Sequence, residues 1–206
     1  MEYFKNIDLN DRYLFEKYLC KINNKSYEYS FTTLYLWKDF CKIEYSIINN
    51  CLIIKKETQN GEFFMMPLGY EKDKLNNLIF TLKKLSTNNN IYLFGDIEDN
   101  FINDLQNYTD LSFKITQDRD NFEYIYSTDK LLNLSGEKYH KKKNHVNAFC
   151  KEYEGRYECR VMMAEDADII SEYLDKWHAM RNIEDEYHRD DYELKGIKEL
   201  IRHSND

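Results

Sequence analysis

The spacing of apolar and polar positions divides the chain into helices and short strands. Leu75, Leu78, Ile79 and Leu82 recur at the spacing of one helical face, whereas short apolar runs bounded by Asn or Gly indicate strands. The predicted helices cover residues 8–20, 30–40, 73–85, 98–108, 129–134, 137–153, 165–180 and 191–203. The predicted strands cover residues 42–48, 51–57, 62–68, 91–94, 113–117, 121–126 and 158–162.

Turn signals arrange the first three strands as an antiparallel meander. Asn49-Asn50 separates the first two strands, and asparagine tolerates the positive φ of a tight turn. The order of two helices, a three-stranded meander, a helix, a strand, a helix and a strand resembles the acetyltransferase-type fold called GNAT. After residue 157 this order begins again. We therefore predict an α/β (α+β) fold with one complete GNAT-like lobe at 1–135, a basic connecting helix at 136–156 and the start of a second, truncated lobe at 157–206.

The composition supports a packed core and excludes some classes of function. Hydrophobic residues make up 42% of the 206 residues and charged residues 32%, which is typical of a globular protein. No apolar run is long enough to predict a membrane span, and residues 1–8 lack the features of a signal peptide, so we expect a cytoplasmic protein. A formal net charge of -8 argues against general binding to DNA.

The cysteines and histidines give no sign of a metal site. The five cysteines are scattered and contain no Cys-x-x-Cys pair, and no His-Glu-x-x-His occurs. We therefore expect reduced, buried thiols and no metal.

One basic island stands out in this acidic chain. Four lysines and two histidines lie within residues 138–145. On a helical projection of 137–153, Lys138, Lys141, Lys142 and His145 form one arc, which we call the cationic ridge. Beside it lies an arc that we expect to be buried, made of Tyr139, Val146, Cys150 and Tyr153 with Phe149 at its edge.

The cationic ridge has three interpretations. Lysine suits phosphate or carboxylate ligands, so the ridge is a candidate binding site for an anionic ligand or tRNA. His145 and Tyr139 are candidates for proton transfer or orientation, although the sequence identifies no catalytic residue. The ridge is alternatively a solvated helix face, or it packs against an acidic surface between lobes.

Three segments together resemble one family. They are residues 30–37 (SFTTLYLW), 120–126 (DNFEYIY) and 131–149 (LLNLSGEKYHKKKNHVNAF). They look like the bacterial proteins grouped with the C-terminal domain of phosphatidylglycerol lysyltransferase. The resemblance covers essentially the whole chain and implies a tandem GNAT-like fold related to the Fem peptidyltransferases.

The resemblance implies an acyl- or aminoacyl-transferase that acts on an amine or hydroxyl acceptor, with acyl-CoA or aminoacyl-tRNA as candidate donors. Two departures matter. The membrane helices of the full lysyltransferase are absent, which argues against a lipid acceptor. The glycine-containing pyrophosphate loop of acetyl-CoA-dependent GNAT enzymes is also absent from the first lobe. The alternative function is a non-catalytic binding module for an anionic ligand, tRNA or a protein partner.

Overall fold

The computed structural model describes residues 4–23, 25–59, 61–87, 90–180 and 189–204. The helices that matter below are α1 (Arg12–Leu19), α2 (Phe31–Leu36), α3 (Leu75–Leu85), α4 (Asp99–Tyr108), α5 (Thr128–Asn133), α6 (His140–Glu152), α7 (Ala167–Met180) and α8 (Arg189–Arg202). The strands are β1 (Lys5–Asn6), β2 (Glu44–Ile48), β3 (Cys51–Thr58), β4 (Gly61–Phe64) and β5 (Asn90–Phe94). The mixture of helices with one five-stranded sheet confirms the predicted α+β class.

The five strands follow one another across the sheet in the order β1-β2-β3-β4-β5. The first three pairings are antiparallel, and β5 joins β4 in parallel after the chain crosses over through α3. The meander predicted from the sequence is therefore confirmed. Its first turn works as expected, because Asn49 and Asn50 both adopt positive φ, at 50° and 62°.

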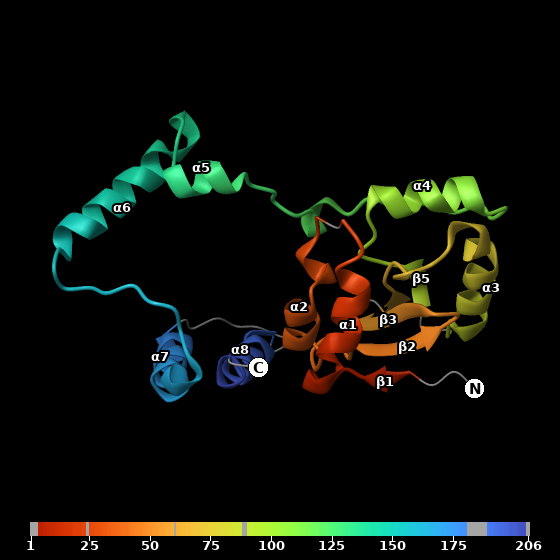
Figure 1. Cartoon of the computed structure of the whole chain (residues 1–206), viewed down its shortest axis with the longest axis horizontal. Coiled ribbons are helices and arrows are strands. Elements are labelled where there is room, and N and C mark those ends of the chain that lie inside the picture. Colours follow the sequence, from red (N-terminus) through yellow and green to blue (C-terminus); the bar gives the residue numbers. More distant parts are fainter. Residues whose placement is uncertain (1–3, 24, 60, 88–89, 181–188, 205–206) are drawn as a thin grey trace. The chain divides into compact units, whose positions relative to one another are not determined.

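Alternation along the strands gives the sheet two apolar faces. On one face Tyr45, Leu52 and Ile54 join side chains from α1, α2 and α4 in the larger hydrophobic cluster. On the other face Ile48 and Ile53 form a smaller cluster with Leu78 and Leu82 of α3. Figure 1 shows α1 and α2 beside each other at one side of the sheet and α3 at the other.

The helix ends follow local rules of capping. The side chain of Asp8 accepts a hydrogen bond from the backbone N–H of Asn10, and the side chain of Asp11 accepts one from the backbone N–H of Asp8, so this pair starts the turn before α1. Ser30 caps α2 by accepting the backbone N–H of Thr33. Both caps lie where the sequence places the helix starts.

Three predicted strands are wrong. Residues 113–117, 121–126 and 158–162 form neither strand nor ladder within the described parts of the chain. Their alternating pattern suits a strand, but a strand needs a hydrogen-bonding neighbour, and no described segment pairs with them. Most of their apolar side chains stay in solvent: Tyr124 is 87% exposed and Val161 80%, whereas Phe113 packs against the larger hydrophobic cluster.

The chain groups into two compact units. The first contains residues 1–115 and 163–206, and the second contains residues 116–162. The sheet, α1 to α4, α7 and α8 belong to the first unit, whereas α5 and α6 belong to the second. The lobe boundaries at 135 and 156 stay a prediction. Across the described residues, no helix combines the length and the apolar character that a membrane crossing requires.

Candidate functional site

The cationic ridge lies on α6 and on the 3-10 turn Glu137–Tyr139 before it. Gly136 adopts a φ of 96° just ahead of this turn, a conformation that glycine adopts without strain. The regular spacing of α6 places Lys141, Lys142 and His145 along one side of the helix, and Lys138 lies in the 3-10 turn before it. All four side chains are exposed to solvent.

No carboxylate in the part of the chain that the structure describes pairs with a lysine of the ridge. Within the described residues, Lys138, Lys141 and Lys142 form no ion pair, and the only side-chain contact on this turn of α6 joins His140 to Asn144 at 3.4 Å. Like charges one turn apart repel one another on a helix surface. An anion bound along this side would relieve that repulsion.

The arc beside the ridge is not buried, contrary to the expectation from the sequence. Val146 is 49% exposed and Tyr153 38%, Cys150 is exposed, and only Tyr139 is half-buried. The physical reason lies in the second unit, which holds two helices and no sheet among its described residues. Such a unit has no layer broad enough to cover one side of α6.

Aromatic rings contact one another at the end of the ridge. Phe149 stacks on Tyr153 with 4.8 Å between ring centroids and meets the edge of Tyr157 at 5.2 Å. The guanidinium of Arg156 lies 5.0 Å from the centre of the Tyr153 ring. The helix therefore presents cations and partly exposed aromatic faces together, a combination that suits a ligand with both charge and flat rings.

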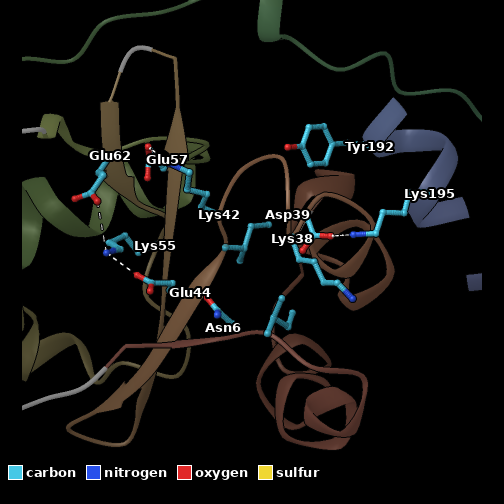
Figure 2. Close-up of a pocket in the computed structure, with 12 residues that line it drawn as sticks. Asn6, Lys38, Asp39, Lys42, Glu44, Lys55, Glu57, Glu62, Tyr192 and Lys195 are labelled. Carbon is cyan, nitrogen blue, oxygen red and sulfur yellow. Dashed lines mark hydrogen bonds and ion pairs between the residues drawn. The ribbon is translucent and has the colours of Figure 1, made fainter. Parts of the chain in front are cut away.

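A separate pocket of about 700 Å³ opens in the first unit. It lies beside the sheet, between the β2–β3–β4 meander, the residues that follow α2, and α8 (Figure 2). Its lining holds four lysines and four carboxylates, namely Lys38, Lys42, Lys55, Lys195, Asp39, Glu44, Glu57 and Glu62. No local sequence pattern marks this pocket, because its walls come from segments far apart in the chain.

Each lysine of the pocket already has an acidic partner. Figure 2 shows Lys195 reaching Asp39, at 2.6 Å, and Lys55 held by Glu44, at 2.7 Å. Lys42 contacts Glu57 at 2.6 Å, and this hydrogen bond raises the pKa of the lysine. The lining is thus neutral as a whole, so the pocket attracts an anion less strongly than the ridge does.

The remaining lysine of the pocket belongs to the contact between α2 and α8. Glu199 of α8 accepts a hydrogen bond from the hydroxyl of Tyr35, at 2.5 Å. It also forms an ion pair with Lys38, at 3.1 Å. Burial raises the pKa of Glu199, but these two hydrogen bonds outweigh it and hold that pKa below its usual range. Gly196 allows the close approach, since a Cβ there would lie 2.7 Å from the backbone oxygen of Leu36.

A buried ion cluster lies on the other face of β3. Lys56 is 5% exposed and contacts the carboxylates of Glu28 and Asp96, the latter at 2.9 Å. Burial alone would lower the pKa of Lys56. The two carboxylates raise it by more than burial lowers it, so the net shift of the pKa is upward. The sequence contains a signal for the burial of Lys56. Alternate residues of a strand point to the same face, so Lys56 lies on the inward face with Leu52 and Ile54.

The predictions for the thiols are confirmed only in part. Cys51 is buried, as expected, whereas Cys20, Cys150 and Cys159 are exposed. The expectation of buried thiols is wrong for these three: Cys150 and Cys159 lie where no layer covers the chain, and Cys20 follows the last residue of α1. In the described ranges, no group of three or more His, Cys, Asp or Glu side chains is placed to hold a metal ion.

Comparisons with known proteins agree with this architecture. A crystal structure of a conserved protein of unknown function from Bacteroides thetaiotaomicron VPI-5482 matches the fold with a TM-score of 0.82 and 25% sequence identity, over all of this chain and 68% of that one. No functionally curated protein matches significantly. The family model described as phosphatidylglycerol lysyltransferase, C-terminal, matches residues 21–206. The resemblance seen in the sequence is confirmed: the chain belongs to the phosphatidylglycerol lysyltransferase C-terminal family.

Proposed function

We propose that this protein is an acyl- or aminoacyl-transferase that moves an activated group to an amine or hydroxyl acceptor. The observation that carries the proposal is family membership across residues 21–206. The sheet gives further support, because two helices, an antiparallel meander, a crossover helix and a parallel fifth strand follow one another in the order of a GNAT-like lobe. We also propose that residues 157–206 begin a second such lobe.

The reaction requires little covalent chemistry from the protein. The acceptor nitrogen or oxygen attacks the carbonyl carbon of the acyl group and loses a proton. The bond to the donor oxygen or sulfur then breaks, and that atom leaves with a proton. A protein accelerates such a step by holding donor and acceptor together and by stabilising the oxyanion.

The ridge supplies a place for the donor. Acyl-CoA and aminoacyl-tRNA both carry phosphates, and Lys138, Lys141 and Lys142 are exposed cations without an acidic partner among the described residues. We assign them the binding of donor phosphates. His145 lies on the same side of α6 and Tyr139 at its start, so they are the candidates for moving a proton.

A second candidate function is a non-catalytic binding module. One observation favours it: each pocket lysine of the first unit is neutralised by Asp39, Glu44, Glu57, Glu62 or Glu199. Lysines that are already paired with carboxylates contribute to the stability of the fold. They contribute little to stabilising the negative charge that develops on an oxyanion during transfer. On this view the ridge alone binds the ligand, which is released unchanged.

The ridge is tested by charge reversal. Lys141→Glu with Lys142→Glu is compared with Lys83→Glu and Lys84→Glu, an exposed lysine pair in the last turn of α3 that makes the same change of net charge. Binding of tRNA and of acyl-CoA is measured by fluorescence anisotropy over a range of salt concentrations. We expect the ridge variant alone to lose affinity.

The magnitude follows from counterion release. If both lysines contact phosphates, the loss of these two contacts reduces the slope of log affinity against log salt by about 1.4–1.8. Equal losses in the ridge variant and the α3 variant would refute a local site on α6. Transfer is then assayed with labelled aminoacyl-tRNA and labelled acyl-CoA against amine acceptors. Ridge-dependent binding without labelled product supports the binding module instead of the transferase.

A further inference from the structure

Two exposed thiols lie near one side chain in the second unit. Cys150 belongs to the last turn of α6, and Cys159 follows in the stretch that leaves this helix; both are free and exposed. The hydroxyl of Tyr157 donates a hydrogen bond to the sulfur of Cys150 at 3.4 Å, and the Tyr157 ring packs against Phe149. The chain after α6 is therefore held against the turn of the helix that carries Cys150.

The backbone turns just before the second thiol. Gly155 has a φ of 69°, and the N–H of Arg156 donates to the carbonyl of Tyr153 at 2.8 Å, so the chain reverses after the helix ends. Cys159 comes two residues after Tyr157 in a stretch without helix or strand. A tether of two residues therefore links Cys159 to the side chain that contacts the sulfur of Cys150.

Electrostatics agrees with this placement. The hydrogen bond to Cys150 raises the pKa of Tyr157, and Cys159 contributes a smaller rise. The other thiols differ. Burial raises the pKa of Cys41 and of Cys51, which disfavours their thiolate forms, and Cys20 belongs to the other compact unit.

We propose that Cys150 and Cys159 form a reversible disulfide that closes the turn after α6. With a peroxide as the oxidant, one thiolate attacks a peroxide oxygen and becomes a sulfenic acid while water or an alcohol leaves. The second thiolate then attacks the sulfenic sulfur, the S–S bond forms, and a second oxygen leaves as water. Two thiols are oxidised by two electrons and one peroxide bond is reduced. A dithiol reductant reverses the step by thiol–disulfide exchange.

Closing this loop has a structural effect. It fixes the stretch that carries Tyr157 against α6 and holds the aromatic group of Phe149, Tyr153 and Tyr157 in one arrangement. That group lies at the end of the cationic ridge. The inference stands on the two thiols and does not require the ridge to bind a donor.

The test uses the whole chain, treated with a small amount of hydrogen peroxide, alkylated to block free thiols and digested with trypsin. Cleavage after Lys143, Lys151, Arg156 and Arg160 releases Cys150 in peptide 144–151 and Cys159 in peptide 157–160. We expect these two peptides to appear joined, lighter than their sum by two hydrogen atoms and separated by dithiothreitol. Cys159→Ser must abolish the joined species, whereas Cys20→Ser must leave it unchanged.

Preorganisation is tested by rate. Two cysteines so close in sequence also meet in an unfolded chain, so the same oxidation is timed in urea. We expect faster joining in the folded protein, and slower joining in Tyr157→Phe, which loses the hydroxyl that contacts Cys150. Equal rates with and without urea would overturn the proposal. The proposal is also overturned if peptides joining Cys20 to Cys150 or Cys159 are as abundant as the peptide pair that joins Cys150 to Cys159.

Discussion

Replacing Lys56 by methionine removes a buried charge while keeping most of the side-chain volume. The substitution leaves the carboxylates of Glu28 and Asp96 facing each other without their shared cation. Both carboxylates belong to the packed first unit, so their repulsion and lost hydrogen bonds fall on its stability. We expect a marked loss of folding free energy.

The size of the loss follows from burial. Removing one partner of a fully buried ion pair costs about 3–5 kcal/mol. The Lys56 side chain is 6% exposed, but Glu28 is 24% and Asp96 31% exposed, so water reaches the carboxylates that remain. We therefore expect about 2–3 kcal/mol, which for a chain of this size lowers the melting temperature by about 4–12 °C.

The assay is urea unfolding followed by circular dichroism. Lys42→Met is the matched control, because Lys42 also pairs with a carboxylate but its side chain is 66% exposed, and such pairs contribute about 0–1 kcal/mol. Adding Glu28→Gln and Asp96→Asn to Lys56→Met should recover much of the loss, since the neutral amides no longer repel. If Lys56→Met and Lys42→Met unfold at the same urea concentration, the reasoning from burial is refuted.

Two further predictions concern the contact between α2 and α8. Gly196→Ala should destabilise the protein by about 1–3 kcal/mol in urea unfolding, because the new methyl group meets the backbone of Leu36, whereas the same change at an open helical site stabilises. A wild-type or higher urea midpoint would show that α8 is not so close to α2. The pKa of Glu199 is lower in the folded protein than its value of about 4.5 in the unfolded chain. Glu199 therefore contributes folding free energy above pH 4.5, and this contribution is lost as the pH falls through the pKa of the folded state. Glu199→Gln should remove this part of the pH dependence, and unchanged curves of urea midpoint against pH would contradict it.

Local patterns in the sequence predicted most of the elements. The helix starts at Asp8 and Ser30 follow from side chains that bond to their own backbone, and the turn at Asn49-Asn50 follows from the conformations that asparagine tolerates. These features depend on residues a few positions apart. Local rules therefore suffice for them.

The wrong predictions share a dependence on distant partners. The pattern at 121–126 suits a strand, but a strand exists only when another segment supplies the ladder, and the pattern does not say whether one does. Likewise, the apolar arc of α6 shows which side of the helix can be buried. It does not show whether another segment covers that side. The ridge residues were found because their charges are adjacent in sequence. The Lys56 cluster was missed because Glu28, Lys56 and Asp96 meet only after the sheet has formed.

The close contact of α8 with α2 has a consequence for synthesis in the cell. The side of α2 that carries Tyr35 emerges from the ribosome long before Glu199 and Gly196, its partners on α8. At about 5–20 residues per second, the roughly 160 residues between them take about 8–32 s to make. During that interval the face of α2 has no helix over it. The nascent chain should then be a substrate for chaperones at this position, and a premature stop before residue 189 should leave the same face open permanently.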